Sequence, residues 1–461
     1  MPRHRQVREL LVSIDRDRAI GIGRQIEDQL KEKISAGLLP MGTALPSSRV
    51  LAEDLAVSRG VVTRAYRQLA AEGYIALRQG ANPCVNGFRA TAQRQNGSAE
   101  RFRIDLRADL PDLASFPRGG WLRAQQRGLH SASTRDLGNI DGCGLWSLRA
   151  ELAAYLGRSR GLIVQPETVV ITSGTSQSLS LVTRALAVEG VSEIAFENPS
   201  CWYSHEVVRE AGCEPRGVSV DEEGLVVSEL RDAGFGAVVV SPTHQFPTGA
   251  RLSESRRAAL TEWAIETDGL IIEFDSELRD DNASVASLQK RAPDRVIYLG
   301  STRKTLGPFS SLGWAVLPDN KLTPVMQELS TSLLHVSSFD QLAFRDFLSR
   351  GDYDRHIHKM RDIYRKRRAV LIDGLRRAFP DPVFTGPATG LHVVMLTGHD
   401  GIAQRVCAIA RERGVALDSI GDHALPGYDG PEGLLIGFGQ ISEAAVPGAV
   451  EELQRAFEAA A

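Results

Sequence analysis

Residues 298–308 read YLGSTRKTLGP, an apolar run followed by a short polar loop that carries one lysine, Lys304. An apolar run with turn residues behind it is typical of a buried strand. Further runs of this kind lie on both sides in the sequence, at residues 168–172, 193–196, 236–241, 270–273 and 313–317. Segments with helical periodicity alternate with them, and this alternation predicts a largely parallel α/β sheet.

The loop around Lys304 has the features of a reactive-lysine site. A lysine amine attacks an aldehyde only when it is unprotonated, so a lysine that forms a Schiff base needs a specialised site, whereas a lone loop lysine is usually solvated. Lys304 follows a buried strand and stands three residues after Ser301, which places a hydroxyl and loop amides near a bound anion. We therefore interpret both residues as ligand-binding.

Residues 170–177 read VITSGTSQ, a strand that runs through small residues into a helix. The free N–H groups at a helix N-terminus bind phosphate, so this segment is a candidate phosphate site. Its candidate residues are Ser173, Gly174, Thr175 and Ser176.

Asp275 follows the strand at residues 270–273. A carboxylate there can pair with a protonated pyridine nitrogen, and a helix N-cap is the alternative role. Between the phosphate segment and this acid lies SPTHQFPTG (241–249), a rigid turn after a strand that supplies two more candidate ligand-binding residues, His244 and Gln245.

In this order the phosphate segment, the turn, the acid and the lysine resemble the type I fold of pyridoxal-phosphate-dependent aminotransferases. The resemblance implies an aspartate-aminotransferase-like fold with a large α/β and a small α+β subdomain. It also implies pyridoxal 5'-phosphate as cofactor, joined to Lys304 as a Schiff base with its ring nitrogen at Asp275. Trp202 would stack on the ring, because the usual aromatic position falls near Cys201.

The chain departs from that family at several positions. Ser311 stands where a phosphate-binding arginine is usual, Leu278 where a tyrosine follows the acid, and Asn139 where the partner subunit supplies a tyrosine. Leu435 replaces the arginine that holds a substrate carboxylate, and Arg279 and Arg303 are possible replacements or solvated charges. The sequence therefore does not support an efficient aminotransferase.

A second informative stretch lies near the N-terminus, LPSSRVLAEDLAVSRGVVTRAYRQLAAEGYIALRQG (45–80). Apolar spacing predicts helices at residues 24–36, 48–56 and 59–72, the second with Val50, Leu51 and Leu55 turned inward, followed by a small β-wing. This is the order of a winged helix-turn-helix, whose second helix reads the major groove of DNA. The alternative is a solvated basic helix in another bundle.

Within this block, arginine and hydroxyl side chains near the start of the third helix suit base and phosphate contacts. The candidate DNA-contacting residues are Arg49, Ser58 (also a candidate N-cap), Arg59, Thr63, Arg64 and, in the wing, Gly80. The block resembles GntR-type regulators, and from about residue 20 to its end the chain resembles their MocR/GabR-type branch. That resemblance implies a head-to-tail homodimer on a double-stranded DNA operator.

Charge and composition agree with this division. Residues 1–90 carry 14 Lys+Arg against 9 Asp+Glu, and the remaining residues carry 40 against 48. We predict a DNA-binding domain at 10–85, a polar linker at 86–104 and an aminotransferase-like domain at 105–461, with its small subdomain at about 345–461. A basic front on an acidic body suits a nucleic-acid module joined to another domain.

The five cysteines are odd in number and include no CxxC pair, which favours reduced thiols in a cytoplasmic protein over disulfides or a metal site. No stretch approaches the ~20 apolar residues that a membrane helix needs.

Three functions remain open. The first is a transcriptional regulator that senses pyridoxal phosphate, or an amine that reacts with it, through Lys304. The second is a regulator whose aminotransferase-like body no longer binds the cofactor and serves for dimerisation or another ligand. The third is a working transaminase with an added DNA-binding module, which the missing carboxylate arginine disfavours.

Overall fold

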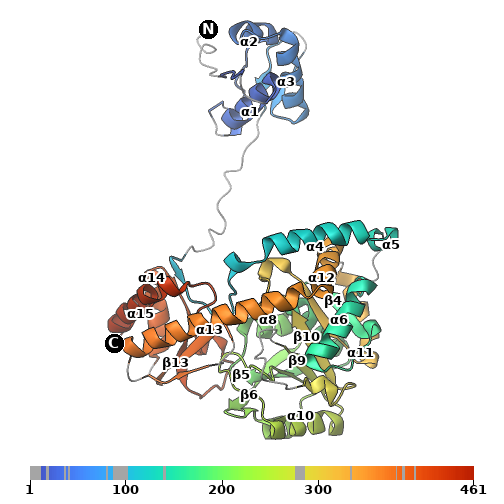
Figure 1. Cartoon of the computed structure of the whole chain (residues 1–461), viewed down its shortest axis with the longest axis vertical. Helices are drawn as coiled ribbons and strands as arrows, with labels where there is room; N and C mark the ends of the chain where they lie inside the picture. The colour runs from blue at the N-terminus through green and yellow to red at the C-terminus, as the bar shows by residue number, and fades with distance from the viewer. Residues whose placement is uncertain are drawn as a thin grey trace. The chain divides into compact units, whose positions relative to one another are not determined.

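The computed structural model describes residues 12–16, 20–35, 38–39, 42–78, 81–86, 102–138, 142–275, 286–332, 335–379, 382–386, 390–398 and 401–460. The chain divides into two compact units, residues 1–100 and 101–461 (Figure 1). Among the described residues, no helix combines the length and apolar character that crossing a membrane requires.

The first unit contains helices α1 (Ile22–Ser35), α2 (Ser48–Asp54) and α3 (Arg59–Ala71), followed by the antiparallel pair β1 (Ile75–Ala76) and β2 (Cys84–Val85). The predicted helices and wing are therefore confirmed. Their apolar faces meet in one core that includes the fully buried Ile26 and Leu69. Val50 is a wrong prediction, because its side chain is 44% exposed. It precedes the buried Leu51, and successive helical residues point about 100° apart.

The second unit is built on an eight-stranded sheet in the order β4-β11-β10-β9-β8-β5-β6-β7. Strands β10, β9, β8, β5 and β6 are parallel, while β11 and β7 run antiparallel to their neighbours. The bounds are β4 (Val169–Thr172), β5 (Glu193–Asn198), β6 (Glu214–Asp221), β7 (Gly224–Leu225), β8 (Ala237–Val240), β9 (Leu270–Phe274), β10 (Val296–Ser301) and β11 (Gly313–Val316). All six predicted strands are present, and the prediction of a largely parallel sheet is confirmed.

Helices cover both faces of this sheet (Figure 1). Alternate side chains of β4 point to opposite faces, as the pleat requires. Val169 and Ile171 join a core with α4 (Arg118–Ser131), α6 (Trp146–Arg160) and α12 (Ser338–Ser349). Val170 joins the opposite core with α7 (Thr175–Val188), α8 (Trp202–Glu210) and α11 (Asp319–Ser332). Burial on both faces explains why these strands are apolar throughout.

The C-terminal subdomain has its own four-stranded sheet in the order β12-β13-β16-β15. The long, basic helix α13 runs from the larger subdomain's helices to this sheet (Figure 1). The elements are β12 (Phe384–Thr385), β13 (His392–Gly398), β15 (Asp418–Ser419), β16 (Glu432–Gly437), α13 (Asp352–Ala378), α14 (Ile402–Glu412) and α15 (Val446–Ala460).

The segment that begins the second unit also belongs to this subdomain. Strand β3 (Ile104–Asp105) pairs in parallel with β14 (Val415–Ala416), and Leu106 lies in the C-terminal core. The following backbone packs closely on two glycines. A Cβ at Gly437 would lie 2.2 Å from the Arg107 carbonyl oxygen, and one at Gly439 would lie 1.9 Å from that of Leu110. Residues 107–110 are therefore held in place by backbone contact.

Candidate functional site

The candidate DNA-contacting residues lie on and beside helix α3. Arg59 and Arg64 are exposed, and the Arg59 Nε donates to the Ser48 hydroxyl at 3.4 Å. The Thr63 hydroxyl donates to the Arg59 carbonyl at 2.9 Å. Ser58 occupies the N-cap position of α3, but its side chain makes no capping hydrogen bond there. It is therefore available to another partner.

Arg49 lies on α2 and forms an exposed ion pair with Glu53 at 3.1 Å. Exposed i,i+4 pairs contribute only ~0.3–0.5 kcal/mol, so DNA phosphate can replace this partner. Gly80 lies outside the described residues. The remaining candidates form a basic surface on the first two turns of α3 and the start of α2.

The second unit contains a cavity of about 1190 Å³ between its two subdomains. The sheet and its following loops contribute Asp275, Ser301 and Lys304, and the C-terminal subdomain contributes Asp418 and His423. Of the ten predicted cofactor-binding residues, the structure places eight in the lining: Ser173, Thr175, Ser176, Trp202, His244, Asp275, Ser301 and Lys304.

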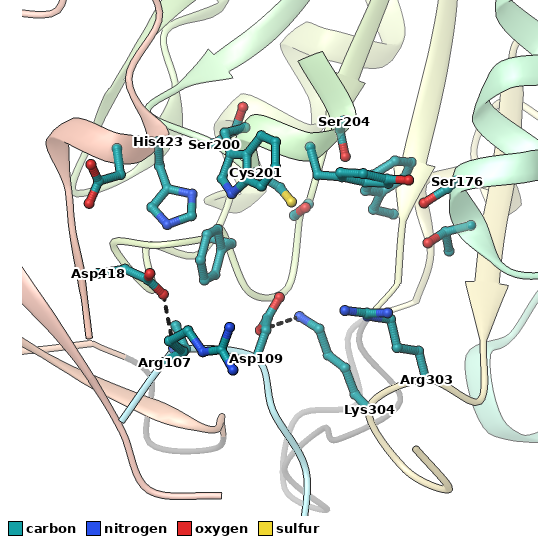
Figure 2. A pocket seen from close by; sticks show the side chains of 18 of the residues that line it. Arg107, Asp109, Ser176, Ser200, Cys201, Ser204, Arg303, Lys304, Asp418 and His423 are labelled. Atoms are coloured by element: carbon teal, nitrogen blue, oxygen red, sulfur yellow. Dashed lines mark hydrogen bonds and ion pairs between the residues drawn. The ribbon is translucent and has the colours of Figure 1, made fainter. Parts of the chain in front are cut away.

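Lys304 points into this cavity and is paired with an acid. Its Nζ lies 2.9 Å from Asp109 Oδ1 (Figure 2). The same atom lies 5.9 Å from the centre of the Phe246 ring. Burial alone would raise the pKa of Asp109, but the Lys304 ammonium outweighs it and holds that pKa below its usual value. Asp109 was not predicted as a site residue, because it is distant in sequence from the lysine loop.

Asp275 is buried, and its carboxylate is already hydrogen-bonded by the protein. Its Oδ2 accepts from Arg160 Nε at 2.6 Å and from the Tyr298 hydroxyl at 2.5 Å. The Asp275 side chain is 0% exposed and that of Arg160 is 5% exposed. Arg160 sits at the end of α6, where Gly161 adopts the left-handed conformation and ends the helix. Asp275 is thus held in a fixed orientation by two hydrogen bonds.

The start of α7 lies on another wall of the cavity. The side-chain oxygen of Gln177 accepts from both the Ser173 N–H, at 2.7 Å, and the Ser173 hydroxyl, at 3.0 Å. The Thr175 and Ser176 hydroxyls face the cavity, and no hydrogen bond within the described residues engages them. A helix N-terminus with two such hydroxyls suits an anion.

Gly174, which precedes α7, is not in the lining and has a packing role. Its backbone is in contact with Gly313, where a Cβ would lie 2.6 Å from the Gly174 Cα. Arg303 lies on the same wall as Lys304, and its side chain is directed into the cavity (Figure 2). No ion pair within the described part of the chain involves Arg303, so this wall carries a cation available to an anionic ligand.

His244 and Gln245 occupy different environments. Burial lowers the pKa of His244 to about 3, and its Nε2 is buried without a hydrogen-bond partner among the described residues. Gln245 lies outside the lining, where its amide donates to the Pro199 carbonyl at 2.6 Å and its oxygen accepts from the Thr248 hydroxyl at 2.6 Å. Gln245 therefore stabilises the turn.

Trp202 begins α8 and is 50% exposed, with its ring edge-to-face on Tyr203 at 5.5 Å. Ser311 has a φ of 36° and its hydroxyl donates to the Pro308 carbonyl at 3.2 Å. Leu435 is fully buried in β16 and lies outside the cavity lining. Asn139, Leu278 and Arg279 lie outside the described residues.

Comparison with known proteins agrees with this architecture. Residues 22–82 match the family of bacterial regulatory proteins of the gntR type, and residues 109–428 match aminotransferase class I and II. The chain belongs to the MocR-type transcriptional regulators, in which these two domains are fused. We call the first unit the winged-helix unit and the second the aminotransferase-like unit.

Two regulators illustrate the relationship. The pyridoxine biosynthesis regulator PdxR of Corynebacterium glutamicum is 31% identical over 94% of this chain and 96% of its own length. The probable rhizopine catabolism regulatory protein MocR of Rhizobium meliloti is 29% identical over 80% of each chain. These relationships support a DNA-binding transcriptional regulator with an aminotransferase-like domain.

Solved aminotransferases share the fold of the larger unit. An archaeal alanine:glyoxylate aminotransferase superposes with a TM-score of 0.71 at 23% identity, covering 87% of this chain and 95% of its own. The α-aminoadipate aminotransferase LysN of Thermus thermophilus, complexed with N-(5'-phosphopyridoxyl)-L-leucine, has a TM-score of 0.69 at 25% identity, covering 77% and 92%. The predicted aspartate-aminotransferase-like fold is therefore confirmed.

Proposed function

We propose that this regulator binds pyridoxal phosphate through a Schiff base at Lys304 and senses that vitamer, or an amine that reacts with it, to control its binding to an operator. The observation that carries the proposal is the position of Lys304. Its amine lies inside a cavity whose walls also hold an oriented acid, Asp275, and the N-terminus of α7. These three features meet there although they are far apart in sequence.

The residues present fit the cofactor. The hydroxyls of Thr175, Ser176 and Ser301, together with the Arg303 guanidinium, would hold the phosphate, and Asp275 would face the ring nitrogen. The Nε2 of His244 is buried without a hydrogen-bond partner in the described parts of the chain, which supports a polar ligand atom beside it, since buried polar groups are rarely left unpaired. Pyridoxal phosphate, when bound, supplies an aldehyde that condenses reversibly with amines.

Efficient transamination is not part of the proposal. Leu435, at the position where the family's carboxylate-binding arginine would stand, packs in a buried cluster with Ala108, Val394 and Ile420. A side chain enclosed in this way cannot bind a substrate carboxylate. The domain is therefore better suited to sensing a ligand than to turning one over.

We further propose that ligand binding changes the arrangement of the two subdomains. The cavity lies between them, so a ligand that binds their closed arrangement more tightly shifts the protein toward that arrangement.

We also propose that the protein acts as a head-to-tail homodimer on repeated half-sites. Sedimentation of the protein with and without operator DNA measures the assembly. A strictly monomeric protein bound to one half-site would contradict this part of the proposal.

The cofactor is tested by the visible absorption spectrum of the purified protein supplied with pyridoxal phosphate, before and after borohydride reduction. We expect an imine band that borohydride abolishes, with the cofactor then attached to the peptide that contains Lys304. Colourless protein that still binds its operator would instead support a regulator whose body binds no cofactor. The observation that favours this second candidate is that Arg160 and Tyr298 already occupy Asp275 Oδ2.

A further inference from the structure

We propose that Asp109 and Phe246 form an ammonium-binding site, and that in the regulator this site receives a primary amine without an adjacent carboxylate. Lys304 itself shows the geometry, because its ammonium rests 2.9 Å from the Asp109 carboxylate and 5.9 Å from the Phe246 ring centre (Figure 2). A carboxylate and an aromatic face are the two groups that bind an ammonium ion well. The inference rests on the proposed function, in which Schiff-base formation removes the lysine ammonium from this place.

Asp109 is held rigidly in position. Its φ of 68° lies in the left-handed region, which few residues other than glycine adopt and which often marks a functional constraint. Neighbouring bonds fix the segment on both sides, since Ala108 N–H donates to Asp418 at 3.3 Å and Asp112 N–H donates to Tyr364 at 2.9 Å. The carboxylate therefore stays in the cavity when its partner changes.

The Phe246 ring is also held in position by its neighbours. Its ring lies edge-to-face with His392, at 5.2 Å between centres, and with His423, at 4.8 Å. His423 is 5% exposed and lines the cavity, and neither of its ring nitrogens has a partner within the described residues. A ligand atom in this part of the cavity would satisfy one of them.

The charges around Asp109 leave Lys304 as its principal cation. Burial lowers the pKa of His244 to about 3 and that of His423 to about 4, and it also lowers the pKa of His392, so all three rings are neutral at physiological pH. Once Lys304 is joined to an aldehyde, the Asp109 carboxylate loses its cationic partner. The ammonium group of an incoming ligand would replace that partner.

The same charges disfavour an α-amino acid. Its carboxylate would lie next to Asp109, in a cavity whose lining also includes the carboxylates of Asp418 and Asp422. Two arginines of the lining are engaged elsewhere, because Arg107 makes a bidentate pair with Asp105, at 3.0 and 2.6 Å, and Arg303 would hold the phosphate in the proposed function. We therefore infer that the ligand class is alkylamines rather than amino acids.

The site can be tested without cofactor in a Lys304→Ala protein, where an added amine can take the place of the lost ammonium. Titration calorimetry would compare butylamine with L-norvaline, which is butylamine with a carboxylate on the amine-bearing carbon. We expect butylamine to bind at least about tenfold more tightly than L-norvaline, and a further Asp109→Asn change to weaken it about tenfold or more.

Asp268→Asn is the matched control in the Lys304→Ala background, because Asp268 also has a positive φ, 58°, and also pairs with a basic side chain, that of Arg295, but is 82% exposed. If Asp109→Asn fails to fold, Asp109→Gly suits the backbone and replaces it. Equal butylamine affinity with and without Asp109, absence of butylamine binding, or preference for L-norvaline would overturn the inference. Asp109-dependent amine binding in a chain whose unaltered form gives no imine band would instead refute the proposed cofactor and leave the amine site standing.

Discussion

In the winged-helix unit the candidate contact arginines lie on the outside, over a core that does not involve them. In the aminotransferase-like unit two charged candidates are paired with charged side chains of the protein, since the fully buried Asp275 pairs with Arg160 and the partly buried Lys304 pairs with Asp109. This contrast predicts which substitutions lower the stability of the fold. A surface arginine can be lost with little effect on folding, whereas a buried charge leaves its partner without compensation.

The largest expected effect is on the buried pair. Arg160→Ala removes the guanidinium that pairs with the buried Asp275 carboxylate, and we expect it to lower the free energy of unfolding by ~3–5 kcal/mol. Arg377→Ala, which removes an exposed pair with Asp373 on α13, should cost less than about 0.5 kcal/mol. Urea denaturation of both variants measures the contrast. Equal stabilities would show that burial does not distinguish these pairs.

Substitution in the winged-helix unit should affect DNA binding and leave stability unchanged. Arg59→Ala is expected to weaken operator binding by ~1–3 kcal/mol, the value of a lost bidentate contact. Gel-shift titration measures the loss, and Arg24→Ala on α1 is the control, since Arg24 is exposed on another helix of this unit. Unchanged affinity and unchanged sequence preference would remove Arg59 from the interface.

Substitution of Arg303 tests whether this exposed cation on the cavity wall binds the phosphate in place of the usual arginine, which is Ser311 in this chain. We expect Arg303→Ala to weaken the binding of pyridoxal phosphate by roughly tenfold to a hundredfold, because a charge-assisted contact is lost. Pyridoxal, which lacks the phosphate, should bind the parent and the variant alike. An equal loss for both compounds would place Arg303 away from the phosphate.

The smallest effect expected is that of Lys304→Ala on operator binding without ligand. Because the lysine belongs to the other unit, its loss should change operator affinity by less than about 0.5 kcal/mol. Gel-shift titration of the unliganded variant checks this. A variant that folds but does not bind the operator would show that the lysine site is required for structure rather than for signalling.

The sequence alone predicted most of the architecture. Strands buried on both faces, such as β4 and β10, are apolar throughout and were found, whereas β6 and β7 were not. Strand β6 lies near the edge of the sheet and reads EPRGVSVD, with exposed charged residues that give no apolar run. The pairing of β3 with β14 was also not predicted, because it joins residues about 300 apart in the chain.

The candidate site was also predicted only in part, because local sequence patterns mark some of its residues and long-range contacts define the others. Lys304, Asp275 and the start of α7 stand at strand ends, where the pattern of the chain itself marks them. Asp109 and Arg160 were missed because their roles depend on partners 195 and 115 residues away. Gln245 shows the reverse error. It lies in a conspicuous motif, but its side chain hydrogen-bonds, among the residues described, to its own turn and to Pro199 rather than facing the cavity.

The pairing of β3 with β14 bears on how a signal could travel. Asp109 stands four residues after Asp105, and the chain that precedes β3 carries the winged-helix unit. A ligand that binds Asp109 as proposed would therefore contact a residue only a few peptide bonds from the strand that the chain enters from the winged-helix unit. The end of strand β3 and the proposed ligand-binding carboxylate thus belong to the same five-residue segment, 105–109.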